Sequence, residues 1–158
     1  MKRTLTTLII LACAWTAAPA AQTADHKAVQ DAVAAFLLHL GDHEFDKVAT
    51  DLSAKSIIIV VRERPASGAG QAEWTNSYQT GESWVETLKK NPNPTTFREP
   101  LTNVSVTIDS GRLAYVRADF QTVRDGKVGS SGVDQFTLTL ENGAWKIAAI
   151  AYTSLPVK

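Results

Sequence analysis

Three turn signals constrain the fold of this chain more than any other feature of its sequence. Ser110-Gly111, Asp125-Gly126 and Asn142-Gly143 each separate runs in which apolar and polar residues alternate. Such dipeptides favour two-residue turns between antiparallel strands, and the alternation is typical of strands with one buried face. The last third of the chain is therefore predicted to form a four-stranded antiparallel meander.

Counting outward from two-residue turns predicts the register of this meander. Arg117 is then opposite Asp134, and Leu140 is opposite Trp145. The weak strand sequence at 129–132 is where a bulge would shift the pairing by one residue. One face is predicted to be the core, and it carries Val104, Val106, Ile108, Leu113, Tyr115, Phe136, Leu138, Leu140, Trp145 and Ile147.

The preceding part of the chain has helical spacing of its apolar residues. A helix is predicted over 25–41, capped by an aspartate and stopped by a glycine, and a second helix follows over 42–52. Five consecutive β-branched residues, 57–61, predict a strand covered on both faces. After the loop-like segment 65–70, a third helix is predicted to begin near Thr80 and to stop before two prolines.

Composition fits one soluble domain. The chain has 158 residues, 44% of them hydrophobic, with 16 Lys and Arg against 16 Asp and Glu. A formal charge of zero argues against the basic surface that nucleic-acid binding requires. No nucleic-acid partner is therefore expected.

The N-terminus is predicted to be an export signal. A basic start, Met1-Lys2-Arg3, precedes an apolar run that is too short to span a membrane, and Ala18-Pro19-Ala20 offers small residues for cleavage. Residues 1–20 are thus a predicted signal peptide, and residues 21–158 are predicted to form a single domain. The protein is predicted to be periplasmic or secreted and not to insert into a membrane after cleavage. Lipidation at Cys13, which lies in a loose lipobox, is the alternative. Removing residues 1–20 leaves 14 basic against 16 acidic residues, a charge of −2, and no cysteine.

Three charged residues stand on the predicted core face. Arg117 and Asp119 are two residues apart on one strand, and Asp134 is opposite Arg117 in the predicted register. The favoured interpretation is a structural ion pair that holds two strands in register. The alternative is an acid and base pair, in which burial raises the pKa of one carboxyl while Arg117 keeps the other ionised.

The order of helices, strand, helix and long meander resembles the nuclear-transport-factor-two-like superfamily. The segment Glu141-Asn142-Gly143-Ala144-Trp145-Lys146-Ile147 is similar to the "dGxWkI" ending of its SnoaL-like and ketosteroid-isomerase-like members. The resemblance implies an α+β cone, a cystatin-like roll in which N-terminal helices pack in the concave face of a strongly curved, mostly antiparallel sheet. It also implies a homodimer formed through the reverse face of the sheet, where the register puts Val116, Phe120, Ile150 and Tyr152.

The resemblance implies several chemistries, because members include isomerases, dehydratases, epoxide hydrolases and binding modules. Arg117 and Asp119 resemble an Arg-x-Asp step of limonene-epoxide-hydrolase-like members, whereas the second acid of those enzymes has no counterpart in the final strand. The three histidines, His26, His39 and His43, fall in the N-terminal third, and we expect no metal and no cofactor.

The leading hypothesis from the sequence is a domain that binds a small apolar or aromatic molecule and is not an enzyme. The alternatives are a cofactor-independent hydrolase or isomerase that uses Asp119, Asp134 and Arg117, and a structural dimerisation domain with a filled cone. The predicted ligand-binding residues are Trp74, Tyr78, Trp84, Thr102, Tyr115 and Phe136.

Overall fold

The computed structural model describes residues 19–64, 72–93 and 95–156, with side chains from residue 25 on. The predicted signal peptide and Cys13 lie outside this part of the chain, apart from the backbone of residues 19 and 20. The elements, in chain order, are α1 (Pro19–Gly41), α2 (Phe45–Asp51), β1 (Leu52–Arg64), β2 (Glu73–Thr80), α3 (Gly81–Lys90), β3 (Leu101–Asp109), β4 (Leu113–Arg124), β5 (Lys127–Glu141) and β6 (Ala144–Pro156).

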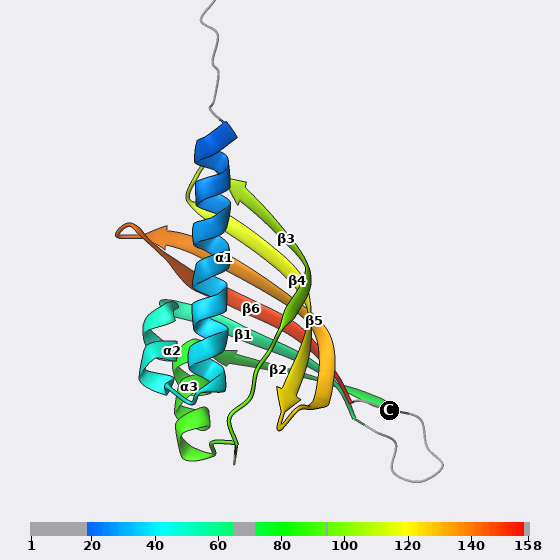
Figure 1. Cartoon of the computed structure of the whole chain (residues 1–158). Coiled ribbons are helices and arrows are strands. Elements are labelled where there is room, and N and C mark those ends of the chain that lie inside the picture. Colours follow the sequence, from blue (N-terminus) through cyan, green and yellow to red (C-terminus); the bar gives the residue numbers. More distant parts are fainter. Residues whose placement is uncertain (1–18, 65–71, 94, 157–158) are drawn as a thin grey trace, which may run out of the picture.

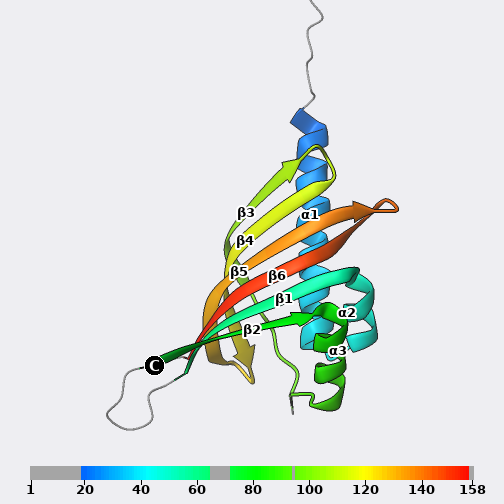
Figure 2. The same ribbon diagram turned by 180° about the vertical axis from the view of Figure 1, so that it is seen from behind.

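The strands form one curved sheet in the order β2-β1-β6-β5-β4-β3. All neighbours are antiparallel except β1 and β6, which are parallel. The helix α1 crosses the concave face, and α2 and α3 lie together at one end of it (Figure 1). Seen from behind, the sheet presents its outer face with no described helix over it (Figure 2). The predicted α+β class is confirmed.

The helices follow the predicted signals, but α1 and α2 begin at other residues than predicted. The helix α2 begins at Phe45, with Glu44 as its N-cap, instead of directly after Asp42. The helix α3 begins after Thr80, whose Oγ1 accepts a hydrogen bond from the backbone N–H of Ser83 at 3.2 Å, and it stops before the prolines. The helix α1 begins at Pro19 instead of Asp25. Residues 20–24 are rich in alanine, the best helix former, and proline suits a first helical position, so the helix extends toward the N-terminus.

The predicted pairs next to two of the turns are confirmed. Val123 is opposite Val128, and Leu140 is opposite Trp145. In the turns Asp125-Gly126 and Asn142-Gly143 both central residues have positive φ, as type I′ turns require.

The register predicted for β4 is wrong by one residue on both sides. The turn between β3 and β4 contains three residues, 110–112, because Leu113 pairs with Asp109. On the other side, Gly129 is an extra residue in β5, since Thr122 pairs with Ser130. This bulge lies at one of the two glycines where a shift was expected.

Because side chains along a strand alternate between the two faces of the sheet, these two insertions exchange the concave and outer positions of β4 relative to the prediction. Arg117 pairs with Gln135 and lies on the outer face, whereas Asp134 pairs with Ala118 and stays on the concave face. The predicted cluster of Arg117, Asp119 and Asp134 is therefore wrong.

The core lies between α1 and the concave face of the sheet. The concave positions of β4 are Ala114, Val116, Ala118 and Phe120, all buried, instead of the predicted Leu113 and Tyr115. The concave positions predicted on β5 are correct, since Phe136 and Leu138 are buried, but those on β6 are correct only as far as Ile147. Beyond Ile147 an extra residue in β6 puts Ile150 and Tyr152 on the concave side instead of the predicted reverse face. Within the part of the chain that the structure describes, no helix is long and apolar enough to cross a membrane.

The outer face of β1 is not covered within one chain. Ile58 and Val60 are buried on the concave side, but Ile57 is 48% exposed. The prediction of a strand covered on both faces is therefore wrong for the single chain.

Candidate functional site

A cavity of about 300 Å³ opens inside the cone, between the helices and the concave face of the sheet. Its apolar wall includes three aromatic rings. Phe36 from α1 stacks on Trp84 from α3 with ring centroids 6.2 Å apart, and it meets the edge of Phe136 from β5 at the same distance. The polar and charged lining consists of His43, Arg62, Asn93, Glu99, Thr122, Arg124, Ser130, Asp134, Tyr152 and Ser154.

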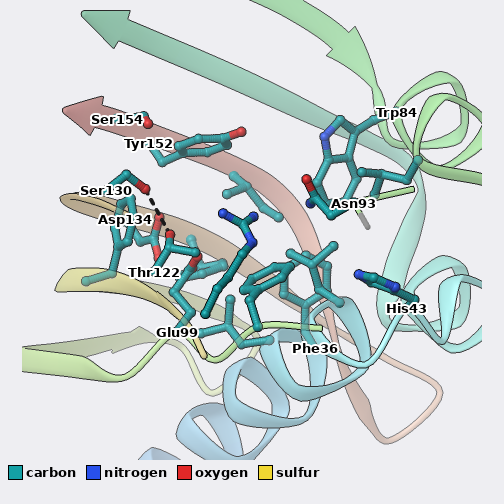
Figure 3. Close-up of a pocket in the computed structure, with 18 of the residues that line it drawn as sticks. Phe36, His43, Trp84, Asn93, Glu99, Thr122, Ser130, Asp134, Tyr152 and Ser154 are labelled. Carbon is teal, nitrogen blue, oxygen red and sulfur yellow. Dashed lines mark hydrogen bonds between the residues drawn. The ribbon is translucent and has the colours of Figure 1, made fainter. Parts of the chain in front are cut away.

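Two carboxyl groups face one another in this cavity. Asp134 lies in β5 with Ala118 on one side and Tyr152 on the other, and it is only 3% exposed. Glu99 comes from the segment between α3 and β3 and reaches the same place (Figure 3).

Backbone hydrogen bonds hold Glu99 in position. The N–H of Phe97 donates to the carbonyl of Gly41 at 3.0 Å, and Arg98 and Val123 exchange two backbone hydrogen bonds at 2.9 and 2.7 Å. Because both residues before Glu99 are anchored in this way, an irregular segment can present a side chain at a defined place.

Burial changes the protonation of both carboxyl groups. It raises the pKa of Asp134 from 3.8 to about 8, and the negative charge of Glu99 contributes further. Burial also raises the pKa of Glu99 from 4.5 to about 7, against the opposing effects of Asp134, Thr122 and Arg124. The pair therefore holds a proton at neutral pH, because the two buried carboxyl groups cannot both ionise easily.

Three buried polar atoms lack a hydrogen-bond partner in the described part of the chain, and all three belong to residues that line this cavity. They are His43 Nε2, Arg124 Nε and Asp134 Oδ2. Buried polar groups in proteins are nearly always paired, so the concentration of three unpaired atoms distinguishes this cavity from the rest of the described structure.

The surroundings hold these groups in place. The Arg124 guanidinium carbon lies 5.1 Å from the centre of the Phe97 ring. His43 has a positive φ of 61° in the tight turn between α1 and α2, and its ring stacks on Phe45 at 5.5 Å. Ser130 donates a hydrogen bond to Thr122 at 3.0 Å, across the bulge at Gly129.

Tyr152 closes the cavity beside the carboxyl pair. It is opposite Asp134 because β6 contains an extra residue between its pairs with Thr137 and Leu138, so the predicted pairing of Asp134 with Ala151 is wrong. Burial raises the pKa of the Tyr152 hydroxyl, which therefore stays protonated at neutral pH.

The structure brings some predicted site residues together and separates others. Trp84, Phe136 and Asp134 line the cavity. The other predicted residues lie away from the cavity on exposed or half-buried positions: Trp74, Tyr78, Thr102, Tyr115, Arg117 and Asp119.

Arg117 and Asp119 form a surface ion pair at 2.8 Å on the outer face. The amide of Asn103 also donates to Asp119 at 2.7 Å, and this hydrogen bond and the Arg117 charge lower the pKa of Asp119. The favoured structural interpretation thus describes these two residues, but Asp134 is not their partner.

Of His39 and His43, one lies outside the cavity and the other lines it. His39 contacts Asp51 at 2.7 Å, so it belongs to the packing of α1 on α2, whereas His43 faces the cavity. Across residues 25–64, 72–93 and 95–156, no three His, Cys, Asp or Glu side chains are grouped so that they could hold a metal ion.

A second, more open groove of about 690 Å³ lies between α1 and strands β3 and β4. Its lining is mostly apolar and includes Val33, Val104 and Val116. Leu37 and Glu99 line both the groove and the cavity. We regard the smaller cavity as the functional site, because the unpartnered polar atoms lie there.

Solved structures of similar shape were found by comparison. A protein of Novosphingobium aromaticivorans proposed to be the β subunit of an aromatic-ring-hydroxylating dioxygenase has a TM-score of 0.64 and 18% identity, over 88% of this chain and 94% of that one. A protein of the same organism proposed to be a scytalone dehydratase has a TM-score of 0.64 and 14% identity, over 84% and 85%. An NTF-2-like protein of unknown function from Shewanella oneidensis has a TM-score of 0.59 and 11% identity, over 84% and 98%.

The chain has the nuclear-transport-factor-two-like cone fold. No protein-family model and no curated protein matches the sequence, so the comparison shows the fold alone. The predicted cone and cystatin-like roll are confirmed by these neighbours, which include a protein with a cystatin-like fold from Nostoc punctiforme.

Sequence reasoning missed the most informative residues of this cone. Glu99 follows two prolines in a segment with no periodicity, and nothing in its spacing points to Asp134. The one usable signal was Phe97, an isolated aromatic residue in an otherwise polar segment, which indicates that the segment is anchored to the core. The sequence did not point to Arg124, because the bulge at Gly129 determines that this side chain lies on the concave face.

Proposed function

We propose that the cone cavity binds a small, largely apolar molecule through one polar group. The observation that carries the proposal is the presence of three unpartnered buried atoms, on His43, Arg124 and Asp134, in a cavity whose other wall is aromatic. A volume of about 300 Å³ is at the small end of the range of ligand pockets. Such a cavity does not favour the alternative of a filled structural cone.

Mass spectrometry of molecules retained by the gently purified protein tests this proposal, with a variant that narrows the cavity. Leu88 lines the cavity from α3, and Leu88→Trp should displace the ligand. Lys90→Trp, at an exposed position on the same helix, is the matched control. Equal retention of the same molecules by both variants would contradict binding in this cavity.

A second candidate function is cofactor-independent acid and base catalysis in the same cavity. The observation that favours it is the Glu99 and Asp134 pair, because two interacting carboxyl groups with raised pKa values can take one proton and give another. Glu99, which ionises first, would act as the base, and protonated Asp134 as the acid. Isomerisation and hydrolysis both proceed by such proton transfers.

Nuclear magnetic resonance in D₂O tests the catalytic candidate with a panel of cyclic ketones and epoxides. Turnover or deuterium incorporation should be lost in Asp134→Asn and in Glu99→Gln. It should persist in Asp119→Asn, because Asp119 lies on the outer face. Turnover that survives Asp134→Asn would exclude the pair as the catalytic acid and base.

A second copy of the chain is the partner that we propose for the outer face of the sheet. The support is the exposure of three large apolar side chains on β1 and β2, since Tyr78 is 70%, Trp74 55% and Ile57 48% exposed. The interface residues predicted from the sequence, Val116, Phe120, Ile150 and Tyr152, face the interior instead. Export through residues 1–20 likewise stays a proposal that rests on the sequence.

A further inference from the structure

The geometry points to an anionic ligand: we propose that the cavity binds an apolar or aromatic molecule bearing a carboxylate, and that the Arg124 guanidinium holds this group. The inference rests on the proposed binding function and names the chemical class of its ligand. It concerns the charge of the ligand, which the aromatic wall alone does not determine.

The first argument is the state of Arg124. Its Nε–H is buried and has no acceptor, and no ion pair in the described part of the chain includes Arg124. A guanidinium group is a donor only and stays charged at all physiological pH values. The nearest acid is Glu99, whose pKa the Arg124 charge lowers, but it forms no ion pair with Arg124 and leaves the Nε–H without an acceptor. A ligand that brings an acceptor should therefore be favoured, and a negatively charged acceptor most of all.

The second argument is the balance of charge in the cavity. The lining contains two arginines, Arg62 and Arg124, and two acids, Glu99 and Asp134. The two carboxyl groups face one another in an apolar space, so they cannot both ionise easily and they share a proton. The cavity therefore carries an excess of positive charge at neutral pH.

The third argument is the position of the aromatic rings. Phe97 supports the flat face of the Arg124 guanidinium at 5.1 Å, which leaves the edge of that group for hydrogen bonds. Phe36, Trp84 and Phe136 form the apolar wall of the same cavity. A ligand with an aromatic body and a short carboxylate arm fits this arrangement, with its rings against the apolar wall and its carboxylate at the guanidinium edge.

Two probes that differ only in charge test the inference. These are 1-naphthylacetate and 1-naphthylacetamide, titrated by calorimetry into the whole exported chain. We expect the carboxylate to bind about ten-fold more tightly than the amide, because a charge-assisted hydrogen bond is roughly twice as strong as a neutral one. Arg124→Gln should remove this preference and change the affinity for the amide by less than about three-fold.

Two further variants keep the test decisive. Arg112→Gln removes a charge from the exposed turn between β3 and β4 and should leave the preference intact. Arg124→Lys keeps the positive charge but lacks the Nε donor, so it should retain part of the preference for the carboxylate. This variant also replaces Arg124→Gln in the test if Arg124→Gln folds poorly.

Equal affinity of the native protein for both probes, or a preference that persists in Arg124→Gln, would overturn the inference while leaving the cavity as a binding site. Failure of both probes to bind would count against the proposed binding function itself, and the inference would fall with it.

Discussion

Replacing Asp134 by asparagine should make the protein more stable at alkaline pH. The carboxyl group is 3% exposed, and its pKa is raised from 3.8 to about 8, chiefly by burial. A carboxyl group whose pKa is higher in the native state than in the unfolded state stabilises the fold while it is protonated. This contribution is complete below the unfolded value of 3.8 and is lost as the pH rises through about 8. An asparagine side chain at this position has nearly the same shape and stays neutral throughout.

The size of the effect follows from the pKa. One unit corresponds to about 1.4 kcal/mol, so a rise from 3.8 to about 8 sets an upper limit of about 6 kcal/mol. Part of the rise is repulsion from Glu99, which also changes with pH, and water in the open cavity weakens the rest. We expect Asp134→Asn to be about 2 to 4 kcal/mol more stable than the native protein at pH 9, and within about 1 kcal/mol of it at pH 5.

Urea unfolding at pH 5, 7 and 9, followed by tryptophan fluorescence, measures the difference. Asp119→Asn is the matched control, because Asp119 is ionised on the outer face beside Asn103 and Arg117, and its replacement should bring no gain at pH 9. A stability difference between Asp134→Asn and the native protein that does not grow with pH would refute the reasoning. A loss of stability at pH 9 would mean that a cation pairs with Asp134.

Three further predictions concern other parts of the chain. Gly132→Ala should lower the melting temperature, because its Cβ would overlap the carbonyl oxygen of Thr153. Gly129→Ala should be tolerated, since the atom nearest to its Cβ is 3.7 Å away. An equal change of melting temperature in both variants would contradict this packing. Tyr78→Glu should shift the protein from dimer to monomer in analytical ultracentrifugation, because it would bury a charge in the proposed interface, and an unchanged mass would remove β2 from that interface. N-terminal sequencing of the exported protein should begin at or near Ala21, and a lipid-modified cysteine as the first residue would exclude cleavage there.

The sequence predicted the elements well, because turn dipeptides and apolar spacing are local signals. The pairs of Val123 with Val128 and of Leu140 with Trp145 lie next to their turns and are correct. The face of β4 was wrong because one inserted residue changes which face of a strand each side chain occupies. One insertion lies in the turn before β4 and the other is Gly129 in β5. Nothing local distinguishes a two-residue turn at Ser110 from the three-residue turn that forms.

The candidate site was harder to predict for the same physical reason. Trp84 and Phe136 were correctly placed in the interior because their own helix or strand has a clear apolar face. Asp134 was correctly placed on the concave face, but its partner was not, since Glu99 is 35 positions away in an irregular segment. Pairs of this kind are set by tertiary packing, and a single sequence does not record them.

The position of β6 in the sheet has a consequence for how the molecule is made. Of the six described strands, β6 is the last to leave the ribosome, yet it lies between β1 and β5 and joins the β1 and β2 pair to the β3, β4 and β5 meander. Each half can form its own hairpins early, but the pairing of β1 with β6 joins residues about 90 positions apart, which favours slow folding. A nascent chain therefore presents two unpaired inner edges until β6 has emerged, and a truncation before Ala144 should yield two fragments of sheet that are prone to aggregate.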